Sequence, residues 1–554
     1  MQRGGRGIGN RNAEIIPAVD ADGARPAALR KVTAAITGDL PVLSNKVIRA
    51  ALAFTAPGGA EIEDMITDGL SDLDDQGVLR AKLGEAVPSL ENGQWKLLPD
   101  GRMETSWRIR DGARWHDGTP LTTADLLFTA MVARDRELTV FRDSTYDLIE
   151  GLEAPDQRSI TVRWKGPYIQ ADTMFTRDLA LPLPKHLLEK PYAEDKSTFL
   201  QHPYWSQEFV GSGPFRVREF ARSSHLILEA FDAYPLGRPK IDEIEVRFIT
   251  DTSTLLANVL AGSVEMTMGR GISMEQALQM RDQWQAGRPL IAPTSWIVIF
   301  PQFVGGTPSA LTDLTFRRAL MHALDREGMA ETIQAGLVPV AHLFLNPKDP
   351  DFERVQGSAL RYDFDVRRAA QLIEGLGFSK GADGAYRDGA GQRLAPQIWT
   401  SGGLDIQVKS IFAVADAWTR VGVAAEPTIV APQRWSDREY VAGFPGFRMN
   451  RQGNTLLSLK NYASSQAPMP ENNFVGANYA RYTNAEFDGL IERYFVTIPT
   501  AERTQVLGQI VRYMTEQLPL LYLYYDTQPM LAANRLENLT ADITGWNAHA
   551  WTMK

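Results

Sequence analysis

Segments with strand and helix periodicity alternate along nearly the whole chain, and this alternation narrows the possible folds more than any other feature. The segment "KVTAAITGDL" (31–40) is predicted to be a strand, and the apolar spacing in "AEIEDMITDGLSDL" (60–73) predicts a helix. The pattern persists to the end, where "TAERTQVLGQIVRYMTEQLPLLYLYY" predicts a helix followed by an apolar strand. Only 94–166 departs from it, with short β-like runs and one helix. The chain is therefore expected to be α/β with a β-rich insert.

Several predicted helices carry signals at their ends. The helix at 122–135 begins with Thr122 or Thr123 as N-cap and has Asp125 in its first turn. The segment 315–336 is the clearest amphipathic helix and closes on Gly336, and 365–378 repeats that design with Gly377. A further helix is predicted at 408–422. A length of 554 residues exceeds what one hydrophobic core usually serves, so two or three domains are expected.

Composition excludes several functional classes. The net charge of −9 is modest and both signs are interspersed, which argues against a nucleic-acid-binding surface. The chain has no cysteine, so disulfides, thiolate metal sites and cysteine nucleophiles are excluded. An absence of cysteine also suits an oxidising compartment. No stretch approaches the roughly 20 apolar residues that a membrane helix needs.

Residues 1–30 are rich in Gly, Arg, Ala and Pro and lack periodicity, so they are predicted to be a flexible tether. They contain no apolar core of a signal peptide. Two interpretations stay open: the chain is not exported, or an export signal or a lipid-anchored cysteine has been removed ahead of the tether.

No enzymatic motif stands out. The seven histidines show no metal-ligand spacing, and no G-x-S-x-G elbow occurs. The "GGRGIGN" stretch (4–10) lacks the flanking strand and helix of a phosphate-binding loop. The dense cluster "RWHDG" (114–118) has a structural explanation, because "HDG" suits a turn and Trp107 and Trp115 suit a core. We therefore predict no catalytic residue, no metal and no cofactor.

Seven motifs in order resemble one family. They include "WRIRDGARWHDGTPLTTADLLFT", "VGSGPFRVREF", "AYPLGRPKIDEIEVRFITDTSTLLANVLAGSVEM", "FRRALMHALDRE" and "YDFDVRRAAQLIEGLGF", together with "LGEAV" (83–87) and "WTRVGV". The chain resembles the peptide, dipeptide and nickel substrate-binding proteins of bacterial ABC importers (family 5, the oligopeptide-binding class). The likeness covers about residues 31–554.

The resemblance implies a bilobed periplasmic-binding-protein fold (type II, cluster C) with an extra β-rich domain inserted in the first lobe. By the family's pattern, the chain would cross between lobes near Pro293 and near Leu521–Tyr525. The implied ranges are 31–70, 209–292 and 525–554 for lobe I, 71–208 for the extra domain and 293–524 for lobe II.

The resemblance also implies three ligand-contacting loops, at 54–59, 399–403 and 447–454. The candidate ligand contacts lie in or near these loops and offer flat aromatic faces or neutral or cationic groups. They are Phe54, Thr55, Trp296, Trp399, Thr400, Ser401, Arg448, Asn450, Arg451 and Asn454. For each tryptophan the competing interpretation is core filling, and for Arg451 it is a solvated loop charge.

The third loop departs from the family in one respect. Peptide-binding members carry there an aspartate that pairs with the peptide's α-amino group, whereas this chain has "FRMNRQGN" (447–454) with no acid. A buried ammonium without a carboxylate partner is costly, which argues against ordinary free-amine peptides. Arg448 and Arg451 suit an anionic group instead.

The leading hypothesis is thus a receptor that is not an enzyme and that delivers its ligand to an ABC transporter permease. Its ligand is expected to be peptide-like or, given the missing aspartate, an oligosaccharide or an acidic or glycosylated compound. We expect a monomer in the periplasm or lipid-anchored at the cell surface. The rival hypotheses are a hydrolase of sugars or peptides and a chaperone-like or regulatory binder.

Overall fold

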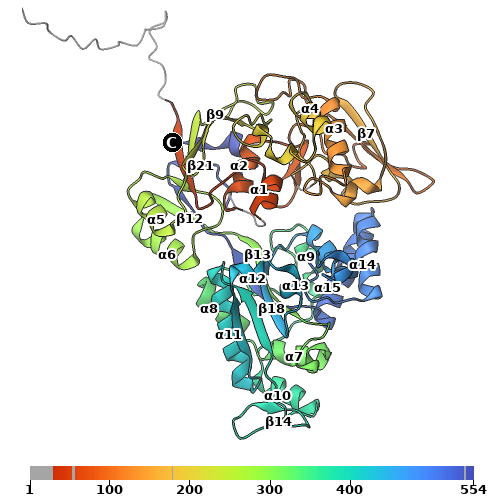
Figure 1. Cartoon of the computed structure of the whole chain (residues 1–554), viewed down its shortest axis with the longest axis vertical. Coiled ribbons are helices and arrows are strands. Elements are labelled where there is room, and N and C mark those ends of the chain that lie inside the picture. Colours follow the sequence, from red (N-terminus) through yellow and green to blue (C-terminus); the bar gives the residue numbers. More distant parts are fainter. Residues whose placement is uncertain (1–28, 53–55, 178, 542–543) are drawn as a thin grey trace, which may run out of the picture.

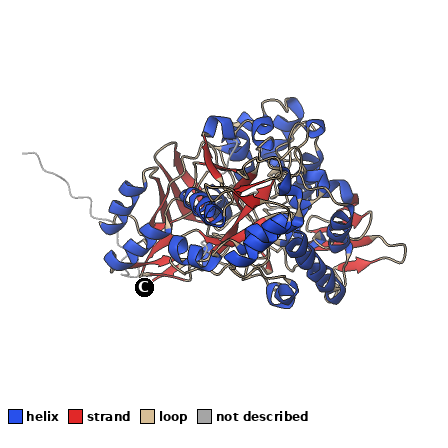
Figure 2. Ribbon diagram, turned by 90° about the horizontal axis from the view of Figure 1, so that it is seen from below, coloured by secondary structure: helices blue, strands red, loops and turns tan. Residues whose placement is uncertain are grey.

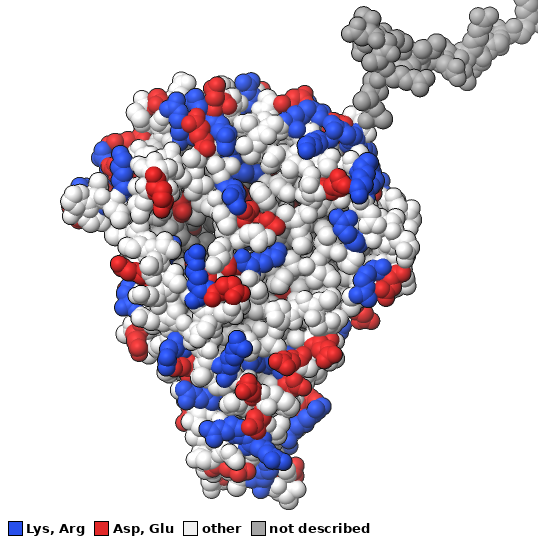
Figure 3. All heavy atoms as spheres, turned by 180° about the vertical axis from the view of Figure 1, so that it is seen from behind, with Lys and Arg blue, Asp and Glu red and all other residues white. Residues whose placement is uncertain are grey.

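The computed structural model describes residues 29–52, 56–177, 179–541 and 544–554. Figure 1 shows a broad upper part, which contains the first strand and the C-terminus, above a narrower lower part coloured green to blue. Figure 2, seen from below, shows strands between helices over much of the molecule and further strands at its right edge. Lys and Arg are mixed with Asp and Glu over the face seen in Figure 3, as the sequence predicts.

The upper part, lobe I, is built on a seven-stranded sheet of order β12-β20-β11-β1-β10-β9-β8. Strand β1 runs parallel to β10 and β11, and the other pairs are antiparallel. Its strands are β1 (Lys31–Ile36), β8 (Phe215–Ala221), β9 (His225–Ala230), β10 (Glu243–Phe248), β11 (Met266–Thr267), β12 (Gly287–Leu290) and β20 (Met530–Ala533). The accompanying helices are α1 (Asn45–Leu52), α2 (Gly59–Ile66), α5 (Thr252–Leu260) and α6 (Met274–Gln283).

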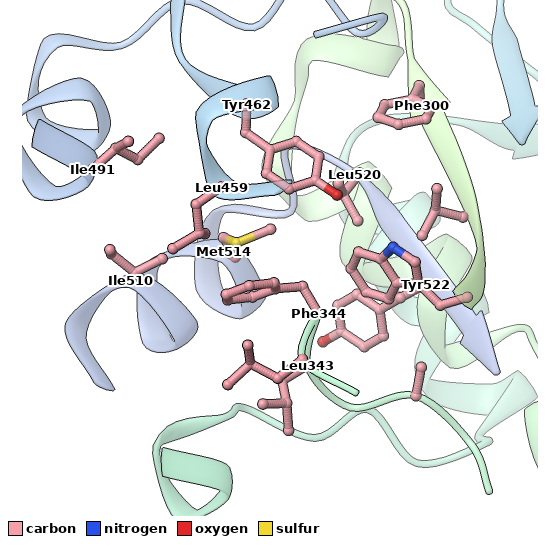
Figure 4. Close-up of a cluster of buried hydrophobic side chains, with 14 of the residues drawn as sticks. Phe300, Leu343, Phe344, Leu459, Tyr462, Ile491, Ile510, Met514, Leu520 and Tyr522 are labelled. Atoms are coloured by element: carbon pink, nitrogen blue, oxygen red, sulfur yellow. The ribbon is translucent and has the colours of Figure 1, made fainter. Parts of the chain in front are cut away.

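The lower part, lobe II, has a five-stranded sheet of order β17-β16-β18-β13-β19. Its strands are β13 (Pro293–Pro301), β16 (Gln397–Ser401), β17 (Glu426–Val430), β18 (Phe447–Gln452) and β19 (Leu521–Thr527). Its helices are α7 (Leu314–His322), α8 (Arg326–Gln334), α9 (Phe352–Val355), α10 (Val366–Gly375), α11 (Asp405–Val421), α12 (Pro432–Trp435), α13 (Arg438–Ala442), α14 (Ala485–Val496) and α15 (Thr500–Gln517). Figure 4 shows part of its core, where Phe344, Met514 and Leu520 surround Tyr522.

The inserted domain contains a four-stranded sheet of order β4-β5-β7-β6. Its elements are β4 (Trp95–Leu97), β5 (Met103–Arg108), β6 (Ile149–Glu153), β7 (Ser159–Trp164), α3 (Thr123–Arg134) and α4 (Lys185–Glu194), with the hairpin β2 (Ser71–Leu73) and β3 (Leu79–Ala81) beside it. The predicted cap of α3 is confirmed, because Thr122 and Asp125 form a capping box.

The "WHDG" stretch is hydrogen-bonded to the "VGSGPF" motif through His116. The Nε2 atom of His116 hydrogen-bonds the carbonyl oxygen of Gly213 (2.9 Å), and Nδ1 accepts from the N–H of Gly211 (3.2 Å). Burial lowers the pKa of His116 to about 4, so the ring is neutral at pH 7. Trp107 and Trp115 are buried, which confirms the structural interpretation of both.

Each sheet takes its strands from the ranges predicted for one domain, except that β19 of the lobe II sheet runs past residue 524 into a range predicted for lobe I. The chain passes from lobe I to lobe II between Leu290 and Pro293, and it returns between Thr527 and Met530, where β19 ends and β20 begins. The predicted boundaries themselves stay a prediction.

The inserted domain also contacts lobe II directly, and we call this the α14 contact. The backbone N–H of Ile169 donates to the carbonyl oxygen of Phe495 in α14 (2.9 Å). The Nζ atom of Lys460 donates to the Tyr168 hydroxyl (2.8 Å) and lies 4.9 Å from the ring centroids of both Tyr168 and Phe495. Figure 1 places α14 beneath this domain.

Two helix predictions were wrong in extent. The helix predicted at 60–73 ends at Ile66, because Thr67 is extended and 71–73 pair with β3 instead. The helix predicted at 315–336 is broken into α7 and α8, because the Asp325 side chain accepts the N–H of Gly328 (2.9 Å) and caps a new helix.

Candidate ligand-binding site

Two clefts lie between the lobes, on either side of the strands that cross between them. The α11 cleft, of about 550 Å³, is bounded by the loop before α6 in lobe I and by the N-terminus of α11 in lobe II. The α2 cleft, of about 520 Å³, is bounded by α1, α2 and the β2–β3 turn in lobe I, and by loops at 346–349 and 454–455 in lobe II. Gln528 lines both clefts, so they adjoin.

Asn454 lines the α2 cleft, and its side-chain amide is buried without a hydrogen-bond partner among the described residues. Its residue is 1% exposed, and neither Oδ1 nor Nδ2 has a hydrogen-bond partner among the described residues. Its backbone oxygen accepts the N–H of Asn346 (3.0 Å), which fixes its place in the loop after β18. A buried amide without partners costs free energy, so this position favours a ligand that supplies a donor and an acceptor.

Helix α2 brings three acids to the same cleft. The Glu63 carboxylate accepts the N–H of Asn45 (3.0 Å), and Asp64 forms an ion pair with Arg177. Glu61 has no ion pair with a described residue. Burial raises the pKa of all three acids, Asp64 most strongly.

Arg451 lies in the α11 cleft, but its charge already has a partner. Its Nε atom donates to Asp526 (2.5 Å), Nη2 donates to the Thr294 hydroxyl (2.9 Å), and Asp526 also accepts from Gln334 (2.7 Å). The side chains of Arg451 and Asp526 are 13% and 5% exposed. In this arrangement Arg451 joins β18 to the crossing strands, and its role as a ligand contact stays a prediction.

Arg448 has aromatic partners instead of an acid. Its guanidinium lies 4.5 Å from the ring centroid of Trp435 and 3.8 Å from that of Tyr479, and Nε donates to Oδ1 of Asn450 (3.1 Å). Burial lowers the pKa of Arg448 to about 10. The structure thus brings Arg448 and Asn450 together on one face of β18.

The two predicted tryptophan contacts are buried and pack against other aromatic rings. Trp296 is buried in the lobe II core and stacks on Tyr522, with ring centroids 6.5 Å apart, and its role as a ligand contact stays a prediction. Trp399 is buried and stacks on Tyr440 (5.0 Å).

Two further predicted contacts in that loop are also satisfied internally. The Thr400 hydroxyl is fully buried and donates to the carbonyl oxygen of Met449 (3.0 Å), and its assignment as a ligand contact stays a prediction. Ser401 accepts from Gln407 (3.3 Å). Phe54 and Thr55, and residues 1–28 of the tether, lie outside the described residues.

Sequence reasoning missed Arg270, which lines the α11 cleft from lobe I. It lies between Gly269 and Gly271, and the signal was the run "MGRGI" directly after an apolar strand. Two glycines around one arginine indicate a tight loop that presents a single side chain.

Among the described residues, no three His, Asp or Glu side chains are grouped as a metal site would require. Nor does the described part of the chain hold a helix long and apolar enough to span a membrane.

The sequence is similar to a known protein family and to characterised members of it. Residues 85–467 match the model for "Bacterial extracellular solute-binding proteins, family 5 Middle". The oligopeptide-binding protein AppA of Bacillus subtilis (strain 168) is 23% identical over 522 residues, which cover 90% of this chain and 88% of AppA.

Two solved structures show the same fold. The oligopeptide-binding protein of Thermus thermophilus, complexed with a pentapeptide, has a TM-score of 0.73 and 23% identity over 95% of this chain and 96% of its own. The periplasmic EDTA-binding protein EppA has a TM-score of 0.77 and 16% identity over 98% and 99%. These likenesses confirm the predicted α/β periplasmic-binding-protein fold.

Proposed function

The chain belongs to family 5 of the bacterial extracellular solute-binding proteins, and from this premise we propose that it encloses one polar ligand between its lobes and delivers it to an ABC transporter permease. The protein is a solute-binding receptor of an ABC importer, and its place of action is outside the cytoplasm. We further propose that it works as a monomer, either free in the periplasm or lipid-anchored at the cell surface.

The observation that carries the proposal is the unsatisfied amide of Asn454 in the α2 cleft. A ligand that supplies a donor and an acceptor there recovers the free energy lost by burying this amide. Since the cleft is bounded by both lobes, such a ligand stabilises the closed arrangement over an open one. The two named solved structures are described with a pentapeptide and as EDTA-binding, so family membership leaves the ligand open.

We propose an oligosaccharide or an acidic or glycosylated compound as the ligand. The support is that β18 and the loop after it carry no acid, and that Asn454 in this loop lines the α2 cleft with an amide that has no partner among the described residues. A free-amine peptide is the second candidate, because Glu61 faces the α2 cleft without an ion pair among the described residues.

A thermal-shift screen tests the proposal, since a ligand that binds only the folded state raises the melting temperature by mass action. The panel contains neutral oligosaccharides, uronic-acid oligosaccharides, and tripeptides with free or acetylated N-termini. We expect the saccharides or the acidic members to stabilise the protein most. Stronger stabilisation by free-amine than by acetylated peptides would overturn the ligand class in favour of the second candidate. Turnover of any panel member would overturn the receptor role in favour of a hydrolase.

A further inference from the structure

A short loop of lobe I holds Arg270 at the wall of the α11 cleft. The Thr37 hydroxyl donates to the carbonyl oxygen of Arg270 (2.5 Å), which fixes the loop against β1. Gly269 has a φ of +70°, and a Cβ there would lie 2.2 Å from the backbone nitrogen of Gly58. Gly271 has a φ of +154°, and a Cβ there would lie 2.4 Å from Thr37. Only glycine fits on both sides, so the backbone presents this one side chain.

Unlike Arg451 and Lys409, which also line the α11 cleft, Arg270 is not paired with an acid among the described residues. Within the described ranges its guanidinium makes no hydrogen bond or ion pair, although it lines the α11 cleft. Asp526 is engaged by Arg451 at the inner end of the cleft. Lys409 faces two acids at the rim, Asp405 at 2.8 Å and Glu275 at 3.6 Å. The inner end therefore carries a positive excess and the rim a negative one.

The surroundings of Arg270 are unfavourable for an isolated cation. Burial lowers its pKa and the like charge of Arg451 acts in the same direction, and these two effects outweigh the opposing charges of Glu61 and Asp526. The first residues of α6 and α11 line the same cleft from opposite lobes. The positive ends of two helix dipoles therefore add to the positive electrostatic potential in the α11 cleft. An anionic group in this cleft would compensate all of these charges at once.

We propose that the α11 cleft is a carboxylate subsite, in which the guanidinium of Arg270 forms a bidentate pair with a carboxylate of the ligand. This inference deepens the proposed function and rests on it: the receptor role comes first, and the subsite names the acidic member of the proposed ligand class.

The test compares matched pairs that differ only in one acidic group. The probes are monogalacturonate with its methyl ester, and an N-acetylated tripeptide with its C-terminal amide, titrated by calorimetry. The variants are Arg270→Gln and Arg270→Lys. Arg281→Gln is the matched control, because Arg281 is an exposed arginine of α6 that pairs with Asp282.

In the parent we expect the acid of at least one pair to bind more tightly than its neutral partner. Arg270→Gln should weaken the acid about ten- to hundred-fold, the usual loss for a hydrogen bond to a charged group. It should leave the neutral partner within about three-fold, and Arg270→Lys should fall between, because a lysine keeps the charge and loses the fork. Arg281→Gln should bind as the parent does.

Equal binding of acid and neutral partners by the parent would overturn the subsite and leave the receptor role standing. The same holds for an acid preference that survives in Arg270→Gln. If neither member of either pair binds, the proposed ligand class itself fails, and the subsite fails with it.

Discussion

Replacing Asn454 by leucine should stabilise the ligand-free protein while it weakens ligand binding. Leucine has as many side-chain heavy atoms as asparagine and a similar branched shape, but it has no polar atom to leave unsatisfied. Asn454 buries both Oδ1 and Nδ2 without partners among the described residues, and each such group costs about 1–3 kcal/mol. Allowing about 1–2 kcal/mol for imperfect packing of the leucine, we expect a net gain of about 2 kcal/mol.

Urea unfolding of the ligand-free protein, followed by tryptophan fluorescence, measures this change as a shift of the midpoint to higher urea. Asn450→Leu is the matched control four residues earlier in β18, because Asn450 accepts a hydrogen bond from buried Arg448 and its removal should destabilise the protein. The reasoning is refuted if both leucine variants lose stability, since Asn454 would then have been satisfied in the free protein.

Three further predictions concern the supporting structure. Arg451→Ala should lower the free energy of unfolding by about 3–5 kcal/mol in urea titrations, because it leaves Asp526 buried with its charge unpaired; a loss below about 1 kcal/mol would contradict this. His116 has a folded pKa of about 4 against about 6.5 when unfolded, so its stabilisation is present above pH 6.5 and is lost as the pH falls toward 4. That loss is about 3 kcal/mol, and the pH dependence of unfolding should be shallower in His116→Asn. Lys460→Ala should weaken the α14 contact by about 1–2 kcal/mol and enlarge the radius of gyration in X-ray scattering; an unchanged radius would show that the contact does not hold the lobes.

The fold followed from the sequence because its signals are local and repeated. Periodicity gave the α/β class, and the capping box of α3 needed only Thr122 and Asp125. The break between α7 and α8 was missed because a capping aspartate in the middle of an apolar pattern resembles a surface charge. The end of α2 was missed for a different reason: a pairing strand at 71–73 overrides helical spacing.

The candidate site was less predictable, because burial and pairing across the chain decide what a side chain can do. Arg451 and Arg448 looked alike in sequence, yet one pairs with Asp526, which is 75 residues away, and the other lies between two rings. Trp296 looked like a ligand-facing aromatic, and its burial depends on Tyr522 in another strand. Arg270 was not recognised because nothing near it in sequence shows that its charge stays unpaired.

The α14 contact has a consequence for how a ligand enters. The inserted domain holds lobe II at one edge and the crossing strands hold it in the middle, so the lobes are tied together along one flank. The opposite flank, between α6 and α11, is spanned by an ion pair of two solvent-exposed side chains, Lys409 and Glu275 at 3.6 Å. An exposed pair of this kind is weak. We infer that the lobes separate at the flank between α6 and α11 while the flank with the α14 contact stays joined. A ligand that enters at α6 and α11 would pass Arg270.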